Sequence, residues 1–360
     1  MDNKKIRIAI THGDTNGTGY ETIFKVFSDP AIFEICTPII YGSPKIAAYH
    51  RKSLDIQANF SIISKVGDAQ DDRINLLTCF DEEVKVELGV PTKASATAAQ
   101  RAITRAMSDF GTGFDALVTA PVAELAIEEG QLPQTQVGVI ERTIGHDGKS
   151  LTIHVGGPLR IASVTGNIPL GDALRELRKD LIVEKATVLF ESLKRDFRLS
   201  NPRIALLQVN PQPGAEEEEI LKPAIAELHN AGVGIYGPYP ADTYFSHYEH
   251  IHFDATLAMY LNQAMTPLRM IAEDSHIQLT AGLPVVVTAP GTGPHFEIAG
   301  QGCADEQSLR EAIYMAIDTF RHRNEYDEPL ADPLKKLYHE KRDDSEKVRF
   351  SIPKKHEQQQ

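Results

Sequence analysis

Short apolar runs alternate along the chain with segments in which apolar residues recur every three or four positions. The runs Ile6–Thr11 (IRIAIT) and Ala116–Thr119 (ALVT) predict buried strands, because they are short, apolar and rich in β-branched residues. Four more strands are predicted at residues 38–41, 159–165, 203–209 and 284–288. The strands therefore recur at intervals long enough to hold a helix between them.

Helical spacing is clearest in residues 92–110, where Ile103, Met107 and Phe110 fall on one face and Thr92 could cap the start. Further helices are predicted from about residue 20, through residues 46–49, and at 181–197, 216–231 and 308–322. Alternating strands and helices predict mostly parallel sheets with helices on both faces. Such sheets bind ligands in loops that follow the strands, which here lie at Gly13, Pro121, Gly166, Asn210, Tyr260 and Gly291.

Two of these loops are rich in glycine. The loop with Gly13, Gly17 and Gly19 precedes a predicted helix, so it could bind an anion at the helix N-terminus or simply form a tight turn. It lacks the third glycine of the dinucleotide fingerprint. The second loop, residues 289–302, holds four glycines that could wrap a flat ligand or merely form a long connection.

Two polar groups suggest chemistry on weaker grounds. Asp242 could act as a general base, although a single aspartate in a turn more often bonds to its own backbone. His247, His250 and His252 suggest zinc, but their spacing is not that of a helical two-histidine motif, and a solvated loop is the simpler interpretation.

Composition narrows the class of protein. The 360 residues are 42% hydrophobic and 24% charged, which suits a folded core. A net charge of −13 disfavours nucleic-acid and anionic-membrane binding, and no apolar run has the length of a membrane span. Three scattered cysteines and no apparent signal peptide predict a cytoplasmic protein without disulfides.

Several segments, taken in order, resemble the 4-hydroxythreonine-4-phosphate dehydrogenases of pyridoxal phosphate biosynthesis. They are ITHGDTNGTGYE, ALVTAPV, LRIASVTGNIPL, PRIALLQVNP, GPYPADTYF, FDATLAMY, LTAGLP and IAGQGCADEQSL. The resemblance implies a two-domain α/β/α fold like that of isopropylmalate and isocitrate dehydrogenases. It also implies a homodimer, NAD, a divalent metal, and oxidation followed by decarboxylation of a phosphorylated hydroxy-amino acid.

Domain boundaries follow from the same resemblance. Residues 1–125 together with 296–326 are expected to form the first α/β domain, on the dinucleotide side. Residues 126–295 are expected to form the second, on the dimer and substrate side. Residues 327–360 are polar and are expected to form a partly disordered tail.

The family's three metal-binding histidines are replaced in this chain. The resemblance places them at Asn167, Gln212 and Leu261. Carboxamides are weak neutral ligands and leucine offers none, so the sequence predicts no metal site.

The substrate-binding positions also differ. A lysine of the family becomes Arg269, an asparagine becomes Gln278 and an arginine becomes Val287. Loss of the arginine removes a bidentate phosphate contact. The residues expected to line a polar pocket are Asn167, Gln212, Asn262, Gln263, Arg269 and Gln278, with Asp242 as the catalytic candidate.

The NAD-binding loop is partly retained. The matching residues, which the resemblance assigns to the adenosine part of NAD, are Gly293, Ile298, Ala299, Gly300 and Gly302. Two hypotheses follow for the whole chain. It is either an NAD-dependent dehydrogenase with altered or lost activity, or a non-catalytic paralogue that binds a metabolite or nucleotide.

Overall fold

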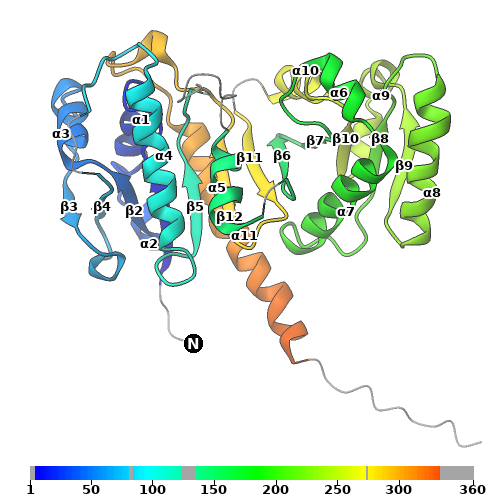
Figure 1. Ribbon diagram of the computed structural model, residues 1–360. Helices are drawn as coiled ribbons and strands as arrows, with labels where there is room; N and C mark the ends of the chain where they lie inside the picture. The colour runs from blue at the N-terminus through cyan, green and yellow to red at the C-terminus, as the bar shows by residue number, and fades with distance from the viewer. Residues whose placement is uncertain (1–4, 81–83, 124–134, 147, 273–274, 333–360) are drawn as a thin grey trace, which may run out of the picture.

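A single mixed sheet forms the centre of the computed structural model, which describes residues 5–80, 84–123, 135–146, 148–272 and 275–332. The strand order is β3-β4-β2-β1-β5-β12-β11-β6-β7-β10-β8-β9 (Figure 1). The strands are β1 Ile6–Thr11, β2 Cys36–Gly42, β3 Phe60–Ile63, β4 Ile74–Thr78, β5 Ala116–Thr119, β6 Leu151–Gly156, β7 Leu159–Ser163, β8 Ile204–Leu207, β9 Ile235–Tyr239, β10 Ala255–Ala258, β11 Ile277–Ala281 and β12 Val286–Pro290. Of the tail predicted at residues 327–360, residues 327–331 are helical and those from 333 onward lie outside the described residues.

Helices cover both faces of this sheet. They are α1 Gly19–Val26, α2 Ile32–Ile35, α3 Pro44–Ser53, α4 Lys93–Ser108, α5 Gln136–Ile144, α6 Leu170–Glu176, α7 Lys179–Arg195, α8 Lys222–Asn230, α9 Ala241–Ser246, α10 Leu261–Ala272 and α11 Gln307–Ala331. In the described part of the chain, no helix has both the length and the apolar character that a bilayer span needs.

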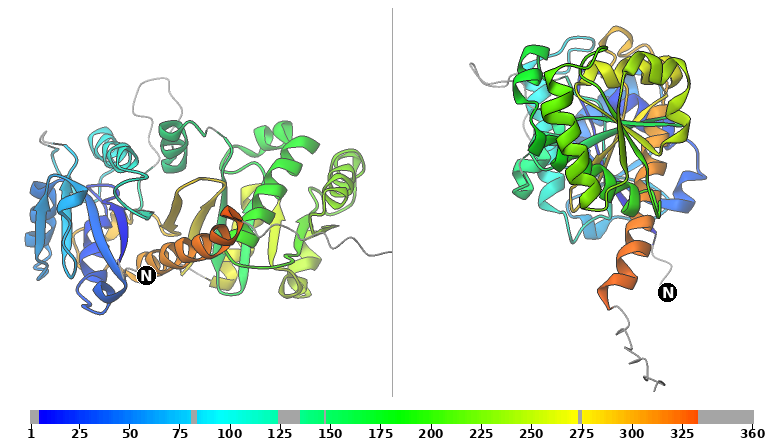
Figure 2. Two further views of the ribbon diagram at one scale, coloured as in Figure 1. Left: turned by 90° about the horizontal axis from the view of Figure 1, so that it is seen from below. Right: turned by 90° about the vertical axis from the view of Figure 1, so that its right-hand side faces the viewer.

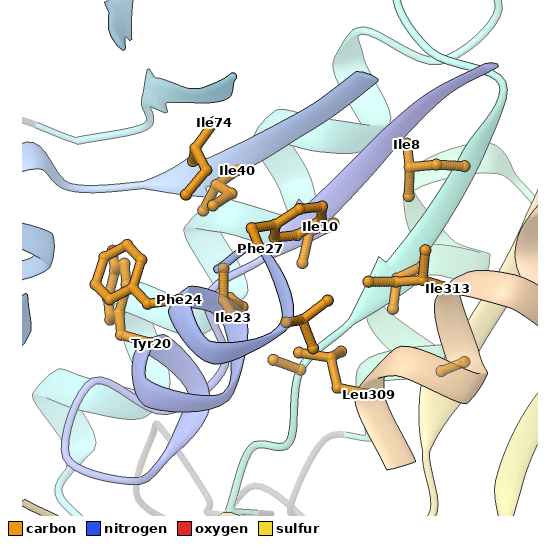
Figure 3. Packing of buried hydrophobic residues seen from close by; sticks show 14 of the residues in the cluster. Ile8, Ile10, Tyr20, Ile23, Phe24, Phe27, Ile40, Ile74, Leu309 and Ile313 are labelled. Carbon is orange, nitrogen blue, oxygen red and sulfur yellow. The ribbon is translucent and has the colours of Figure 1, made fainter. Parts of the chain in front are cut away.

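Successive side chains of β1 point to opposite faces of the sheet, so the N-terminal half of the fold has a hydrophobic core on each face. Ile8 and Ile10 pack with α1 and α11 on one face, as Figure 3 shows. Ala9, between them, belongs to the cluster on the other face, where α4 contributes Ile103 and Met107. Successive strand side chains point to opposite faces, so a fully apolar strand must be buried on both.

The sheet is mostly parallel, as expected, but its central strands are paired in the antiparallel sense. β11 is antiparallel to both β12 and β6, and β6 is antiparallel to β7. Only two residues connect β6 to β7, and a connection that short permits only an antiparallel hairpin. Polar side chains interrupt β6 and β11, so neither strand forms an apolar run in the sequence.

The second half repeats the two-faced arrangement. β7, β10, β8 and β9 are parallel neighbours. One face packs against α7 and α8, whereas the other packs against α9 and α10. The sheet is continuous between the halves, so the strands β12, β11 and β6 form a shared central section.

Several helices differ in extent from the prediction. Thr92 caps α4 as expected, accepting a hydrogen bond from the Ser95 amide in a capping box. The single helix predicted at 216–231 instead begins with a π-helical turn, Glu217–Leu221, before α8. Helix α11 continues to Ala331, past the residue 322 predicted as its end, and Figure 2 shows it running from the first half toward the second.

Candidate functional site

A cavity of about 470 Å³ lies over the central section of the sheet. Its floor is one face of β6, β11 and β12, and its walls are residues that follow β5, β7 and β12 together with the first turns of α5 and α10. Of the six strand-end loops singled out in the sequence, those at Pro121 and Gly166 line it directly, as do Pro290 and Thr292 on either side of Gly291. The loops at Gly13 and Asn210 do not contribute to this cavity.

Strand register determines which side chains form the floor. Gln278 lies opposite His154 on β6 and opposite Ala289 on β12. Thr280 lies opposite Thr152 and Val287 in the same way. Because directly opposed residues of an antiparallel pair share a face, these two rows of side chains point into the cavity together.

His154 is the most unusual residue of the floor. It is 7% exposed, its Nδ1 atom has no hydrogen-bond partner in the described residues, and its ring centre lies 6.1 Å from that of His276. Burial, together with the charges of His276 and Arg269, lowers the pKa of His154 to about 4. The imidazole is therefore neutral near pH 7, with one ring nitrogen that can accept a hydrogen bond.

The surroundings of His154 are built to accommodate a second imidazole. Gly291 packs so closely on the ring of His276 that a Cβ atom at this position would clash with it. The Gly291 amide also donates to the His276 carbonyl oxygen, over 2.8 Å. A glycine at 291 is thus required by the histidine at 276.

Two charged residues of the cavity wall, Lys185 and Glu141, bind the backbone of the segment just before β6. Lys185 donates from Nζ to the carbonyl oxygens of Gly148 and Ser150, at 2.6 and 3.1 Å. Glu141 accepts from the Ser150 amide at 2.9 Å. Both side chains are buried, and their interactions fix the segment that leads into β6.

Two of the predicted polar residues line the cavity, Asn167 and Gln278, together with Leu261 at the third expected metal position. Gln263 instead has a structural role: it accepts from the Met259 amide and donates to the Gln208 carbonyl oxygen. Four others, Gln212, Asn262, Arg269 and Asp242, are exposed and lie outside the cavity lining. Asp242 lies in the first turn of α9, accepts a hydrogen bond from the adjacent Thr243 amide and does not line the cavity.

The residues present do not fit the divalent metal that the resemblance implied. Asn167 and Leu261 face the cavity, whereas Gln212 is exposed on the loop after β8. No group of three histidine, cysteine or acidic side chains is arranged to hold an ion in the part of the chain described. His247, His250 and His252 do not converge, since His250 is buried against Tyr244 and Phe245 while the other two are exposed. One carboxamide and one leucine cannot hold a transition metal.

The first glycine loop is a structural connection. Asp14 and Asn16 are completely buried. Asn16 donates from Nδ2 to the Val90 carbonyl oxygen, and Asp14 accepts from the Ser95 hydroxyl. Backbone amides of the loop also donate hydrogen bonds to the carbonyl oxygens of Pro121 and Pro294, so the loop has no open face for an anion. The tight-turn alternative is the correct one.

The second glycine loop has an open face. Gly293 borders the cavity, and a Cβ atom there or at Gly302 would meet no other residue. Gly300 adopts a left-handed backbone, φ +81°, and packs on Leu88, while Ile298 and Ala299 are half-buried beside it. Backbone that is held in place yet open on one side fits the close approach of a nucleotide.

Sequence reasoning missed His154, Thr152 and Thr280 as cavity residues. The polar positions of SLTIHVG and HIQLTAG, which occur at every second residue, were the available signal. That period indicates strands with one polar face. Which face borders a cavity, however, depends on the antiparallel pairing of β6 with β11.

A family model and the curated relatives of this chain point to the same family. Residues 34–316 match the family model described as "Pyridoxal phosphate biosynthetic protein PdxA". The 4-hydroxythreonine-4-phosphate dehydrogenase of Bacteroides thetaiotaomicron is 45% identical over 359 residues, which cover 97% of this chain and 98% of that protein. The enzyme of the same name from Sulfurihydrogenibium sp. is 30% identical over 319 residues, covering 87% and 98%.

Solved structures agree with these relatives. The 4-hydroxythreonine-4-phosphate dehydrogenase of Klebsiella pneumoniae superposes with a TM-score of 0.75 at 26% identity, covering 89% of this chain and 99% of that one. The enzyme of Burkholderia phymatum gives a TM-score of 0.70 at 26% identity, covering 88% and 99%. The predicted isocitrate-dehydrogenase-like α/β fold is therefore confirmed.

Proposed function

Because the chain belongs to the PdxA family of pyridoxal phosphate biosynthetic proteins, we propose that it is an NAD-dependent oxidoreductase. Its substrate would be a small hydroxylated molecule bound in the cavity over β6, β11 and β12. The single observation that carries the proposal is the buried, neutral imidazole of His154 on the floor of that cavity. The chemistry is oxidation of an alcohol to a carbonyl compound.

His154 is the proton acceptor in this proposal. Oxidation of an alcohol releases a hydride from carbon and a proton from oxygen, and a neutral imidazole has a lone pair to take that proton. Gln278, opposite His154, and Thr280, in the next row, can hydrogen-bond the substrate and orient the reacting hydroxyl. His154 would take the proton, and NAD, when bound, would supply the hydride acceptor that balances the reaction.

NAD would lie against the second glycine loop, where Gly293 joins the cavity to the open backbone. When bound, it supplies the hydride acceptor. We assign no role to a metal ion, because the three positions that would hold it carry Asn167, Gln212 and Leu261.

The test is NADH formation by the purified full-length chain. NAD would be combined with 4-hydroxythreonine 4-phosphate and, separately, with unphosphorylated 4-hydroxythreonine, each with and without a chelator. We expect a rate that the chelator leaves unchanged. A rate that requires added divalent metal would contradict the proposal that the reaction needs no metal ion. If folded protein binds a hydroxylated ligand but forms no NADH with any such ligand, the alternative of a non-catalytic binding paralogue is supported.

A His154→Gln variant sharpens this test. Glutamine keeps a hydrogen-bonding group but cannot take a proton at neutral pH, so we expect a loss of roughly 10²–10⁴-fold in kcat. His247→Gln is the matched control, since His247 is exposed and outside the cavity. The wild-type rate should decline only as the pH approaches the pKa of His154, about 4, and not near 6.5.

A further inference from the structure

Helix α1 supports the second glycine loop at two places. Thr18, just before the helix, donates from its amide and from Oγ1 to the Pro294 carbonyl oxygen, at 3.0 and 3.2 Å. Farther along the helix, Glu21 and Lys25 contact residues 302–304, where the loop ends. Apolar side chains of α1 pack into the core, as Figure 3 shows, so the helix is a fixed support. The helix that follows the first glycine loop therefore forms the base of the second.

Lys25 uses its whole ammonium group to hold this end of the loop. Its Nζ atom donates to the carbonyl oxygens of Gly302 and Ala304, at 2.9 and 2.7 Å, and lies 2.9 Å from Oε1 of Glu21. These three acceptors match the three N–H donors of an ammonium group. The Lys25 side chain is 25% exposed, so the surrounding protein shields most of it from competing water.

Glu21 is a buried carboxylate that binds the amide between these two carbonyl groups. It is 1% exposed, and its Oε1 atom accepts from the Ala304 amide at 2.8 Å. Its Oε2 atom is buried and has no partner among the described residues. A buried carboxylate needs a paired cation, and Lys25 is that cation. Loss of Lys25 would therefore also disturb the contact between Glu21 and Ala304.

These contacts fix the direction in which the peptide groups of the loop face. In a trans peptide the C=O group and the following N–H group point to opposite sides. Because the carbonyl groups of Gly302 and Ala304 point toward Lys25, the N–H groups of Cys303 and Asp305 point away from it. No acceptor for either N–H group occurs in the described part of the chain, and both residues are exposed. The loop thus presents two oriented donors on the side away from Lys25.

We infer that Glu21 and Lys25 are positioning residues for the dinucleotide, which hold residues 302–304 in the shape that NAD binds and do so from the side opposite the ligand. The inference rests on the proposed function, which places NAD against the second glycine loop. A loop already held in its bound shape loses less conformational freedom when the ligand binds. Loss of the pair should therefore weaken NAD binding and leave the chemical step at His154 unchanged.

Calorimetric titration of the full-length chain with NAD tests the inference. Lys25→Met removes the ammonium group but keeps an unbranched side chain, and we expect the Kd for NAD to rise roughly tenfold or more. Glu21→Gln keeps an acceptor for the Ala304 amide and should raise the Kd less. The matched control is Arg310→Met, because Arg310 pairs with Asp29 and Glu306 beside the same helix without contacting the loop. Its Kd should stay within about twofold of the wild-type value, and kcat at saturating NAD should not change in any variant.

Amide hydrogen exchange without NAD gives a second readout. The Ala304 amide should exchange roughly tenfold or more faster in Lys25→Met than in the wild type, because its acceptor Glu21 is no longer held in place. Faster exchange with an unchanged Kd would overturn the inference, since the pair would then be structural only. A higher Kd without faster exchange, or a wild type that does not bind NAD, would overturn it too. If the wild type binds NAD but forms no NADH, the oxidoreductase proposal fails, and the comparison of Kd values still decides this inference.

Discussion

Two imidazoles are buried on opposite sides of the same sheet. His12, directly after β1, stacks on Tyr20 with 5.3 Å between ring centres and is inaccessible to solvent. His154 lies on the cavity floor. Burial lowers the pKa of each to about 4, so both remain neutral over most of the working pH range.

These two histidines make the folded state sensitive to acid. The unfolded chain protonates its histidines near pH 6.5, whereas folded His12 and His154 resist protonation down to about 4. The unfolded state therefore binds more protons in this window. The free energy of unfolding should fall from pH 6.5 to 4 by about 1.4 kcal/mol per pH unit for each histidine. Denaturant titrations at several pH values measure this slope.

A variant isolates the contribution of one imidazole. His154→Gln removes one of the two titrations, so its stability should decline less steeply between pH 6.5 and 4 than that of the wild type. Equal slopes would mean that folding does not lower the pKa of His154.

At the scale of elements, the loop after β8 is organised by one carboxylate. Glu217 is completely buried, and its Oε1 atom accepts from the amides of Val209 and Asn210, both at 2.9 Å. Its Oε2 atom accepts from the Gly214 amide at 2.7 Å. Although burial opposes ionisation, these hydrogen bonds outweigh it and lower the pKa of Glu217. The same loop carries Gln212, so the region expected to supply a metal ligand is closed around an acidic side chain instead.

Replacing this carboxylate should loosen the loop. Glu217→Gln removes the charge and one acceptor, and we expect a loss of about 1–3 kcal/mol in the free energy of unfolding. Glu218→Gln is the control, because Glu218 is exposed and pairs with Lys222 across one helical turn. It should change stability by less than about 0.5 kcal/mol. Urea denaturation compares the two, and equal effects would show that the buried hydrogen bonds contribute nothing specific.

At the scale of the molecule, helix α11 joins the two halves. Its Arg323 forms a buried ion pair with Asp196, which follows α7, at 2.7 Å between Nε and Oδ1. Arg323 also donates to the carbonyl oxygen of Leu283, just before β12. The helix therefore holds α7, on the second half, against the strand that forms the cavity floor.

Breaking this pair should destabilise the whole chain. Arg323→Ala leaves Asp196 buried without its cation, which costs about 3–5 kcal/mol. Arg321→Ala, on an exposed side of the same helix, should change the free energy of unfolding by less than about 0.5 kcal/mol. Thermal unfolding with two probes, one in each half, tests the coupling. If the two probes report one shared transition in the wild type and in Arg321→Ala but separate transitions in Arg323→Ala, α11 connects the two halves.

A homodimer remains a prediction from family resemblance. Several large apolar side chains are exposed on the second half, including Met270 at 81% and Leu174 at 47%. Exposed apolar surface of this kind often marks a contact between subunits. Sedimentation equilibrium of the purified chain should give twice the mass of 39.7 kDa. A monomer at micromolar concentration would contradict the prediction.

The sequence by itself determined the elements with uninterrupted apolar runs or clear helical spacing. Through the resemblance of the neighbouring motifs, it also predicts that Asn167, Gln212 and Leu261 stand at the positions of the family's metal-binding histidines. Both conclusions depend on local chemistry, and so no folding is needed to reach them.

Only the tertiary structure decided which polar residues form the site. His154 and Gln278 are separated by more than a hundred positions in the chain, and the pairing of β6 with β11 brings them together on one floor. The same folding places Asp242 and Gln212 outside the cavity, although the sequence proposed both as site residues. Strand pairing is a non-local event, and a shift of one residue would turn every one of these side chains to the opposite face.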